Sequence, residues 1–141
     1  MRKTIMVVSL IIFIIVTVSV VKNKTAELKD YTVDYGTSEI YTKEDMENAV
    51  NEIMKVFNSF DSKCDMYSIK YCGDETSVKN IDYCNELSNV TMDECIVFES
   101  TFKTPGNAGG GFNSNFVYEG WKWYLARQSD GEWIVLTYGY A

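Results

Sequence analysis

Apolar and polar residues alternate along two stretches near the end of the chain, with Asp130-Gly131 between them. A period of two is typical of β-strands, and Asp-Gly supplies the positive φ angles of a two-residue type I′ turn. The pattern therefore predicts a hairpin over residues 118–140. Its mostly apolar face pairs Trp121 with Tyr140, Trp123 with Tyr138, Leu125 with Leu136 and Arg127 with Ile134. Its mixed face pairs Lys122 with Gly139, Tyr124 with Thr137, Ala126 with Val135 and Gln128 with Trp133.

Between residues 42 and 60 the period changes to that of an amphipathic helix. Thr42 and Asp45 have the spacing of a capping box, and Tyr41 and Met46 that of a hydrophobic staple, so the helix is expected to begin after Thr42. The apolar stripe comprises Met46, Ala49, Val50, Ile53, Met54, Phe57 and Phe60. Such a stripe needs a sheet to cover it. We expect Trp121, Trp123, Tyr138 and Tyr140 of the hairpin to pack against Met46, Ile53, Phe57 and Phe60.

Two further strands are predicted, over residues 64–72 and 93–103, with a short helix between them at 76–87. In the second strand, Ile96, Phe98 and Phe102 share one face, while Cys95, Val97, Glu99 and Thr101 share the other. The glycine-rich segment 104–111 reads as a mobile connector. No Lys-Ser or Lys-Thr follows its glycines, which argues against a phosphate-binding loop. The predicted fold class is α+β, with one long amphipathic helix packed on a curved, largely antiparallel four-stranded sheet.

The N-terminal residues form a separate unit. Basic Arg2 and Lys3 precede an apolar run of 17 residues, Ile5 to Val21, which as a helix would span about 26 Å. No Ala-x-Ala cleavage pattern follows. We therefore expect residues 1–24 to be an N-terminal transmembrane helix that anchors the chain in the cell membrane, residues 25–35 a polar stalk, and residues 36–141 one extracytoplasmic domain. Secretion after cleavage of a signal peptide is the alternative.

Composition excludes several functions for this domain. From Thr25 onward the chain carries nine Lys and Arg against 20 Asp and Glu, a formal charge of −11. Such a surface would repel a phosphate backbone, so nucleic acid is not an expected partner. The chain contains no histidine, which removes the commonest general base and metal ligand. No metal and no cofactor are therefore predicted.

All four cysteines, Cys64, Cys72, Cys84 and Cys95, fall in the part expected outside the cytoplasm, where disulfides are typical. Their spacing lacks the close pairs of a zinc site. Three pairings are possible. A helical crossover between two strands favours parallel neighbours, which would bring the strand beginnings together. This reasoning predicts Cys64 with Cys95 and Cys72 with Cys84.

Four residues are candidates for ligand contact: Glu99, Trp121, Trp123 and Arg127. Glu99 is an acid in the middle of an apolar strand, and Arg127 ends an aromatic strand face, so either could line a cavity. The competing interpretations are a solvent-facing Glu99 and an Arg127 that stacks across Ile134 or caps the sheet. With Trp133, the two indoles could form a stacking platform for a sugar or peptide, but paired aromatics in a small sheet are more often core. No catalytic set is identified.

Several short motifs together resemble an uncharacterised family of small exported proteins from Gram-positive bacteria. The resemblance covers residues 35–140 and depends most on Trp121-x-Trp123-x-Leu125-x-Arg127, Gly131-Glu132-Trp133 and Gly139-Tyr140. It implies domain boundaries but no activity. The chain also resembles cystatin-like and nuclear-transport-factor-2-like folds, in which a helix packs into a curved antiparallel sheet. Those folds serve enzymes and binding proteins alike.

Three function classes follow from these observations. The first is a membrane-anchored binding or interaction module for a small ligand or protein partner. The second is an extracellular hydrolase, which would need two carboxylates converging in one pocket. The third is a structural accessory subunit, which a large exposed apolar patch would favour.

Overall fold

The computed structural model describes residues 30–129 and 131–140. Along these residues the elements are β1 (Thr32–Asp34), α2 (Lys43–Asn58), β2 (Asp65–Tyr71), α3 (Asp74–Lys79), α4 (Ile81–Glu86), β3 (Glu94–Lys103), β4 (Val117–Arg127) and β5 (Ile134–Gly139). The predicted transmembrane helix at 1–24 lies outside this part of the chain. None of the described helices is both long enough and apolar enough to cross a membrane.

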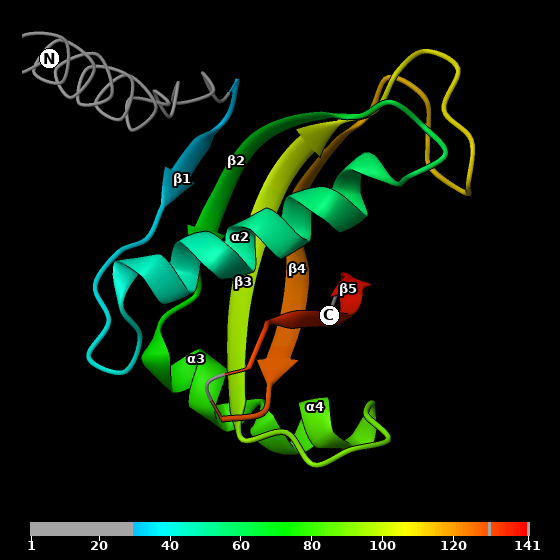
Figure 1. Ribbon diagram of the computed structural model, residues 1–141. Helices are drawn as coiled ribbons and strands as arrows, with labels where there is room; N and C mark the ends of the chain where they lie inside the picture. The colour runs from blue at the N-terminus through cyan, green and yellow to red at the C-terminus, as the bar shows by residue number, and fades with distance from the viewer. Residues whose placement is uncertain (1–29, 130, 141) are drawn as a thin grey trace, which may run out of the picture.

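The described strands form one mixed sheet in the order β1-β2-β3-β4-β5, shown in Figure 1. The prediction of a four-stranded sheet is wrong, because Thr32–Asp34, assigned to the polar stalk, adds a fifth strand parallel to β2. The other neighbours are antiparallel. Helix α2 joins β1 to β2 and returns the chain along the sheet, which is what a parallel pair requires. The parallel crossover therefore lies one connection earlier than the sequence suggested.

Helix α2 lies across one face of the sheet (Figure 1). Its capping box forms as predicted, since Thr42 accepts from the Asp45 backbone and Asp45 accepts from the Thr42 backbone. It has 16 residues and ends at Asn58 with Ser59 as C-cap, so it is shorter than the long helix predicted through residue 60. Its buried residues are Met46, Ala49, Val50, Ile53 and Phe57.

The sheet carries a core on each face. Under α2 lies the main core, which contains Ile96, Phe98 and Phe102 of β3. The opposite face carries a smaller cluster with Cys95 and Val97. The predicted division of β3 into two faces is confirmed. Short helices α3 and α4 cover this second cluster at the end of the sheet where β3 begins.

The predicted helix at 76–87 is two helices of six residues each. Both lie at the end of the sheet where β2 ends and β3 begins, so the chain turns back there and does not return to the start of β2. Strand β3 consequently runs antiparallel to β2.

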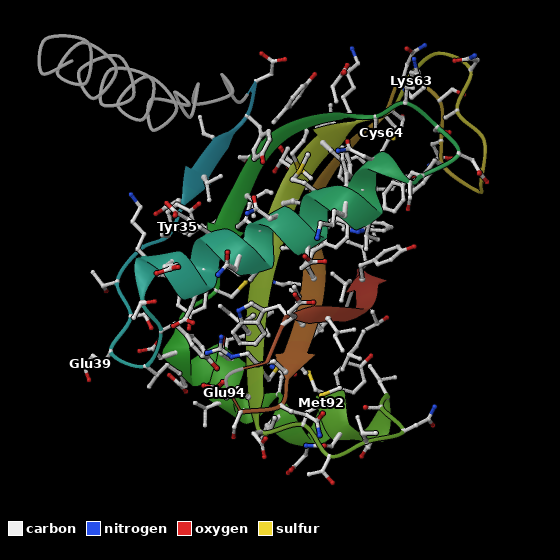
Figure 2. The ribbon with its side chains drawn as sticks, viewed as in Figure 1. Tyr35, Glu39, Lys63, Cys64, Met92 and Glu94 are labelled. Carbon is white, nitrogen blue, oxygen red and sulfur yellow. The ribbon has the colours of Figure 1, made fainter. Side chains whose placement is uncertain are left out.

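This strand direction contradicts the predicted disulfides Cys64–Cys95 and Cys72–Cys84. Cys64 precedes β2 beside the end of β3, whereas Cys95 lies at the beginning of β3. Figure 2 shows Cys64 and Glu94, the neighbour of Cys95, at opposite ends of the molecule. All four cysteines are free thiols, and Cys84 contacts Cys95 instead.

The C-terminal hairpin follows the predicted register only at its open end. Lys122 pairs with Gly139, Trp123 with Tyr138 and Tyr124 with Thr137, but a β-bulge then pairs Leu125 with Val135. Val135 therefore packs on the main core and Leu136 on the second cluster. The strands end at Arg127 and resume at Ile134, so the connection is longer than a two-residue turn.

Asp74, at the start of α3, fixes the loop that leads into α2. Its carboxylate accepts hydrogen bonds from the Ser38 hydroxyl at 2.6 Å, the Glu39 backbone at 2.8 Å and the Tyr71 hydroxyl at 2.8 Å. Led by the Ser38 bond, these contacts hold the pKa of Asp74 below its ordinary value. Residues far apart in the sequence are thereby tied together through one carboxylate.

The stability of the fold is expected to fall in acid. Burial alone would raise the pKa of Asp45, but bonds from Thr42 and Arg127 outweigh it and lower the pKa. A carboxyl group whose pKa is lowered by folding stabilises the fold at pH values above its ordinary pKa of about 3.9. This contribution is lost as the pH falls further below that value. Urea midpoints measured between pH 7 and pH 2.5 should decline below about pH 4. Asp74→Asn should make that decline shallower, because the amide does not titrate. An unchanged decline would contradict the stabilising role assigned to the Asp74 carboxylate.

Candidate ligand-binding cleft

The cleft originates in an irregularity of β4. Ser100 pairs with Trp121 but Phe102 pairs with Tyr118, so β4 carries one extra residue at this point. Gly120 has a φ angle of 67°, which residues other than glycine adopt with strain. Because of this bulge, Tyr118 and Trp121 share a face, although their spacing of three would separate them in a regular strand. Both rings contact Phe102, at centroid distances of 5.2 and 5.5 Å.

Three separate segments complete the walls around a cleft of about 500 Å³. The segment after α2 supplies Phe60, the glycine loop supplies Phe112, and β5 supplies Tyr138. Phe60 lies 5.4 Å from Phe112 and 5.3 Å from Tyr138 between ring centroids. Trp121 closes the ring of contacts, 5.8 Å from Phe112 and 6.3 Å from Tyr138. This volume falls in the range that small-molecule sites occupy, about 300–1,000 Å³.

The glycine-rich segment, predicted to be a mobile connector, is held by hydrogen bonds. The Ser62 hydroxyl accepts from the Gly109 backbone at 2.6 Å and lies 3.2 Å from the Gly109 carbonyl. At the other end, the Asn113 backbone donates to the Tyr118 hydroxyl at 3.0 Å. These bonds hold the glycine-rich segment in position, so that Phe112, which is not part of a strand, lines the cleft. Lys63 and Cys64 mark this end of the molecule in Figure 2.

Asp61 gives the cleft its charge. Its side chain lies beside the glycine loop, where a Cβ added to Gly110 would be 3.8 Å from a carboxylate oxygen. The residue is exposed and forms no ion pair or hydrogen bond within residues 30–129 and 131–140. Among the described residues that line the cleft, it is the one that carries a charge. A cationic group would therefore find a carboxylate without a competing lysine or arginine partner.

The three indole N–H groups have different surroundings. Trp123 donates to the Ser100 hydroxyl at 2.8 Å, and Trp133 donates to the Asp45 carbonyl at 3.0 Å. The Trp121 N–H is buried and has no acceptor in the described part of the chain. A buried polar group left without a partner costs free energy, and such groups are rare in folded proteins. Trp121 is the indole that combines this unpaired donor with a place in the cleft wall.

The other predicted ligand residues lie away from this cleft. Trp123 is fully buried in the main core, so it is no part of a surface platform. Glu99 lies on the opposite face of the sheet and binds Lys122 at 2.6 Å. The Lys122 ammonium also lies 3.6 Å from the Cys72 sulfur, whose pKa is raised chiefly by burial. The Glu99 carboxylate is therefore held in an ion pair with Lys122, away from the aromatic cleft.

Arg127 lies at the far end of β4 and is almost enclosed. Its guanidinium binds Glu94 at 2.5 Å and Asp45 at 2.9 Å, and stacks 4.3 Å from the Trp133 ring. Arg127 therefore does not line the aromatic cleft, and it links helix α2 to the sheet, a role that the sequence did not suggest. Trp133, the third indole of the supposed platform, is buried beneath it.

The predicted aromatic face is partly formed. Trp123 and Tyr138 pack against Phe60 beside the end of α2, and Trp123 also contacts Phe57. Tyr140 instead contacts Tyr118 and Trp121 and remains 59 % exposed. The aromatic face of the hairpin thus extends beyond the end of α2, where its residues form one wall of the cleft.

Among the described residues, no group of three or more Cys, Asp or Glu side chains is placed to hold a metal ion. Three other clefts, of about 770, 530 and 280 Å³, border Asp30, Gly131 and Tyr140, each next to a residue outside the described part. The aromatic cleft is therefore the candidate site whose described walls best define it.

Sequence reasoning identified Trp121 but missed Asp61, Phe112 and Tyr118. The one available signal was Gly120 within a strand pattern, which often marks a bulge. The chain matches no protein-family model, no curated protein and no solved structure, so the resemblances drawn from its motifs remain predictions.

Proposed function

We propose that this domain is a binding module whose aromatic cleft takes an organic cation, such as a quaternary ammonium group or a methylated or free amine. The observation that carries this proposal is the Asp61 carboxylate, which has no partner in the described part of the chain and lies at the edge of a cleft lined by aromatic rings. A cation held over aromatic faces is stabilised by about 0.5–2 kcal/mol per interaction, most where water is excluded. The surrounding negative charge would further concentrate cations near the cleft.

The lining favours a cation over a sugar. A sugar ring offers many hydroxyl groups, which need several hydrogen-bonding side chains to replace water. Phe60 and Phe112 provide none, the Ser59 hydroxyl already donates to the Val56 carbonyl at 2.6 Å, and the Tyr118 hydroxyl accepts from the Asn113 backbone. Among the described lining side chains this leaves the Trp121 N–H, the Tyr138 hydroxyl and the Asp61 carboxylate, which are few for a sugar ring. An ammonium group with carbon substituents needs only ring faces and one carboxylate.

A binding role also fits the absence of paired acids at the cleft. A glycosidase-type hydrolase needs two carboxylates several ångströms apart, and the described lining contains Asp61 alone. The acids Asp45 and Glu94 do converge elsewhere, but both bind Arg127. We place the module outside the cytoplasm, tethered by the N-terminal apolar segment, because that segment has the composition of an export signal. The ligand could then be a free small molecule or an amine on another surface.

Choline is a suitable probe of this site. Titration with choline chloride at constant ionic strength should change the tryptophan fluorescence along a saturating curve, because Trp121 lines the cleft while Trp123 and Trp133 are buried. Asp61→Asn should weaken binding by up to about fivefold, since Asp61 is exposed and an ion pair exposed to solvent contributes roughly 0.2–1 kcal/mol. Glu119→Gln, which removes the same charge from an exposed residue outside the lining, should leave the affinity unchanged.

A neutral ligand separates charge recognition from simple apolar contact. Dimethylbutanol, the carbon analogue of choline, should bind much more weakly than choline. Equal binding of the two would refute the cation proposal. Saturable binding of chitin oligosaccharides without any response to choline would replace it with a sugar-binding function.

A further inference from the structure

The second core cluster contains a pair of cysteines that the ligand cleft does not use. Cys84 of α4 and Cys95 of β3 are both buried, with Met92, Val97 and Ala126 around them. Their sulfur atoms lie 2.9 Å apart. A disulfide bond is about 2.05 Å long, so the sulfurs need to approach by only about 0.9 Å.

We propose that Cys84 and Cys95 form a disulfide in the mature protein and that Cys64 and Cys72 remain thiols. The pairing follows from the packing of α4 against the beginning of β3, and neither predicted pair shares this geometry. It does not depend on the function of the cleft. An extracytoplasmic location would supply the oxidising conditions under which such bonds persist.

The reaction is a thiol–disulfide exchange with an external disulfide, either oxidised glutathione or an oxidoreductase. One thiolate attacks the external disulfide, forms a mixed disulfide and releases one thiol. The second cysteine then attacks the mixed disulfide and releases the other thiol, so two electrons and two protons pass to the reagent. The hydrogen bond between the two cysteines lowers the pKa of Cys84 and, with burial, raises that of Cys95.

The bond would tie α4 to the sheet. Helix α4 has six residues and no side-chain hydrogen bond at its N-cap, so local interactions hold it weakly. Ten residues separate the two cysteines, and closing a loop of that size is expected to raise the Tm by roughly 10 °C. Reduction of the folded protein should be slow, because both sulfurs are covered.

Peptide mapping tests the pairing directly. The full chain, refolded from denaturant in a glutathione redox buffer so that the reagent reaches both sulfurs before they are covered, and then unfolded with an alkylating reagent, should take up two alkyl groups, on Cys64 and Cys72. Trypsin leaves Cys84 and Cys95 in one peptide, since no Lys or Arg lies between residues 80 and 102. A Glu-specific protease separates them at Glu86 and Glu94, and only reduction should then release the two fragments. Four alkylated cysteines, or any linkage through Cys64 or Cys72, would overturn the proposal.

Two variants provide a matched comparison of stability. Cys64→Ser with Cys72→Ser should keep the linkage and lose about 10 °C of Tm on reduction, as the wild type does. Cys84→Ala with Cys95→Ala should melt at the same temperature with and without reductant. If this second variant fails to fold, the loss of Tm on reducing the wild type still tests the bond. A wild-type Tm that reduction leaves unchanged would contradict it.

Discussion

Trp123→Ala is expected to destabilise the domain by about 3–5 kcal/mol, which is a large part of the 5–15 kcal/mol typical of a small domain. Trp123 is fully buried, and its ring contacts Phe57, Phe60 and Tyr138. Truncation would leave a cavity between helix and sheet. It would also remove the donor bonded to the Ser100 hydroxyl, which is itself buried. Equilibrium unfolding in urea measures the loss.

Tyr140→Ala is the matched control for this prediction. Tyr140 is also an aromatic residue of the C-terminal hairpin, but it is 59 % exposed and contacts rings at the cleft. Its removal should cost less than about 1 kcal/mol, as is usual for exposed side chains. Equal costs for the two variants would show that the indole of Trp123 is not the centre of the core.

Arg127→Met should cost about 3 kcal/mol, at the lower end of the range for buried ion pairs. The side chain is 12 % exposed, whereas its partners Asp45 and Glu94 are 25 % and 32 % exposed. Removing the guanidinium leaves both carboxylates partly buried without a cation and ends the stacking on Trp133. The cost should be measured by urea unfolding at neutral pH.

Lys55→Met distinguishes this enclosed pair from an ordinary surface pair. Lys55 also binds a carboxylate, that of Glu52, but its side chain is 71 % exposed, so its loss should leave the urea midpoint almost unchanged. The Arg127→Met penalty should also shrink in acid, as Asp45 becomes protonated and no longer needs a cation. A penalty that stays constant down to pH 2.5 would assign the whole effect to packing.

Local signals explain which elements the sequence predicted well. The capping box at Thr42 and the apolar stripe of α2 each depend on residues within one or two turns, so pattern alone reveals them. Strand β3 likewise shows its two faces as a regular alternation. Edge strand β1 has three mostly exposed residues and is held by parallel pairing to β2, a contact that no local pattern encodes. Because β1 leaves no local pattern, the sequence predicted a sheet of four strands, without β1.

Irregularities explain why the cleft was not predicted. The bulge at Gly120 brings Tyr118 onto the face of Trp121, and one extra residue in a strand leaves little trace in an alternating pattern. Asp61 is distant in sequence from both rings, and Phe112 follows a glycine-rich segment that has no regular pattern. Ser62 brings their segments together through its bonds to Gly109. The disulfide pairing failed for a related reason, since it depended on strand direction rather than on composition.

The most direct test of cation binding in the cleft is a choline titration followed through the indole N–H signals in a nitrogen–proton NMR spectrum. Trp123 and Trp133 have acceptors inside the fold, whereas the Trp121 N–H has none in the described residues. Trp121→Phe assigns its signal. We expect the Trp121 signal alone to move along a saturating curve, and to need more choline for the same movement in Asp61→Asn. No movement of the Trp121 signal, or equal movement of all three, would contradict the proposed function.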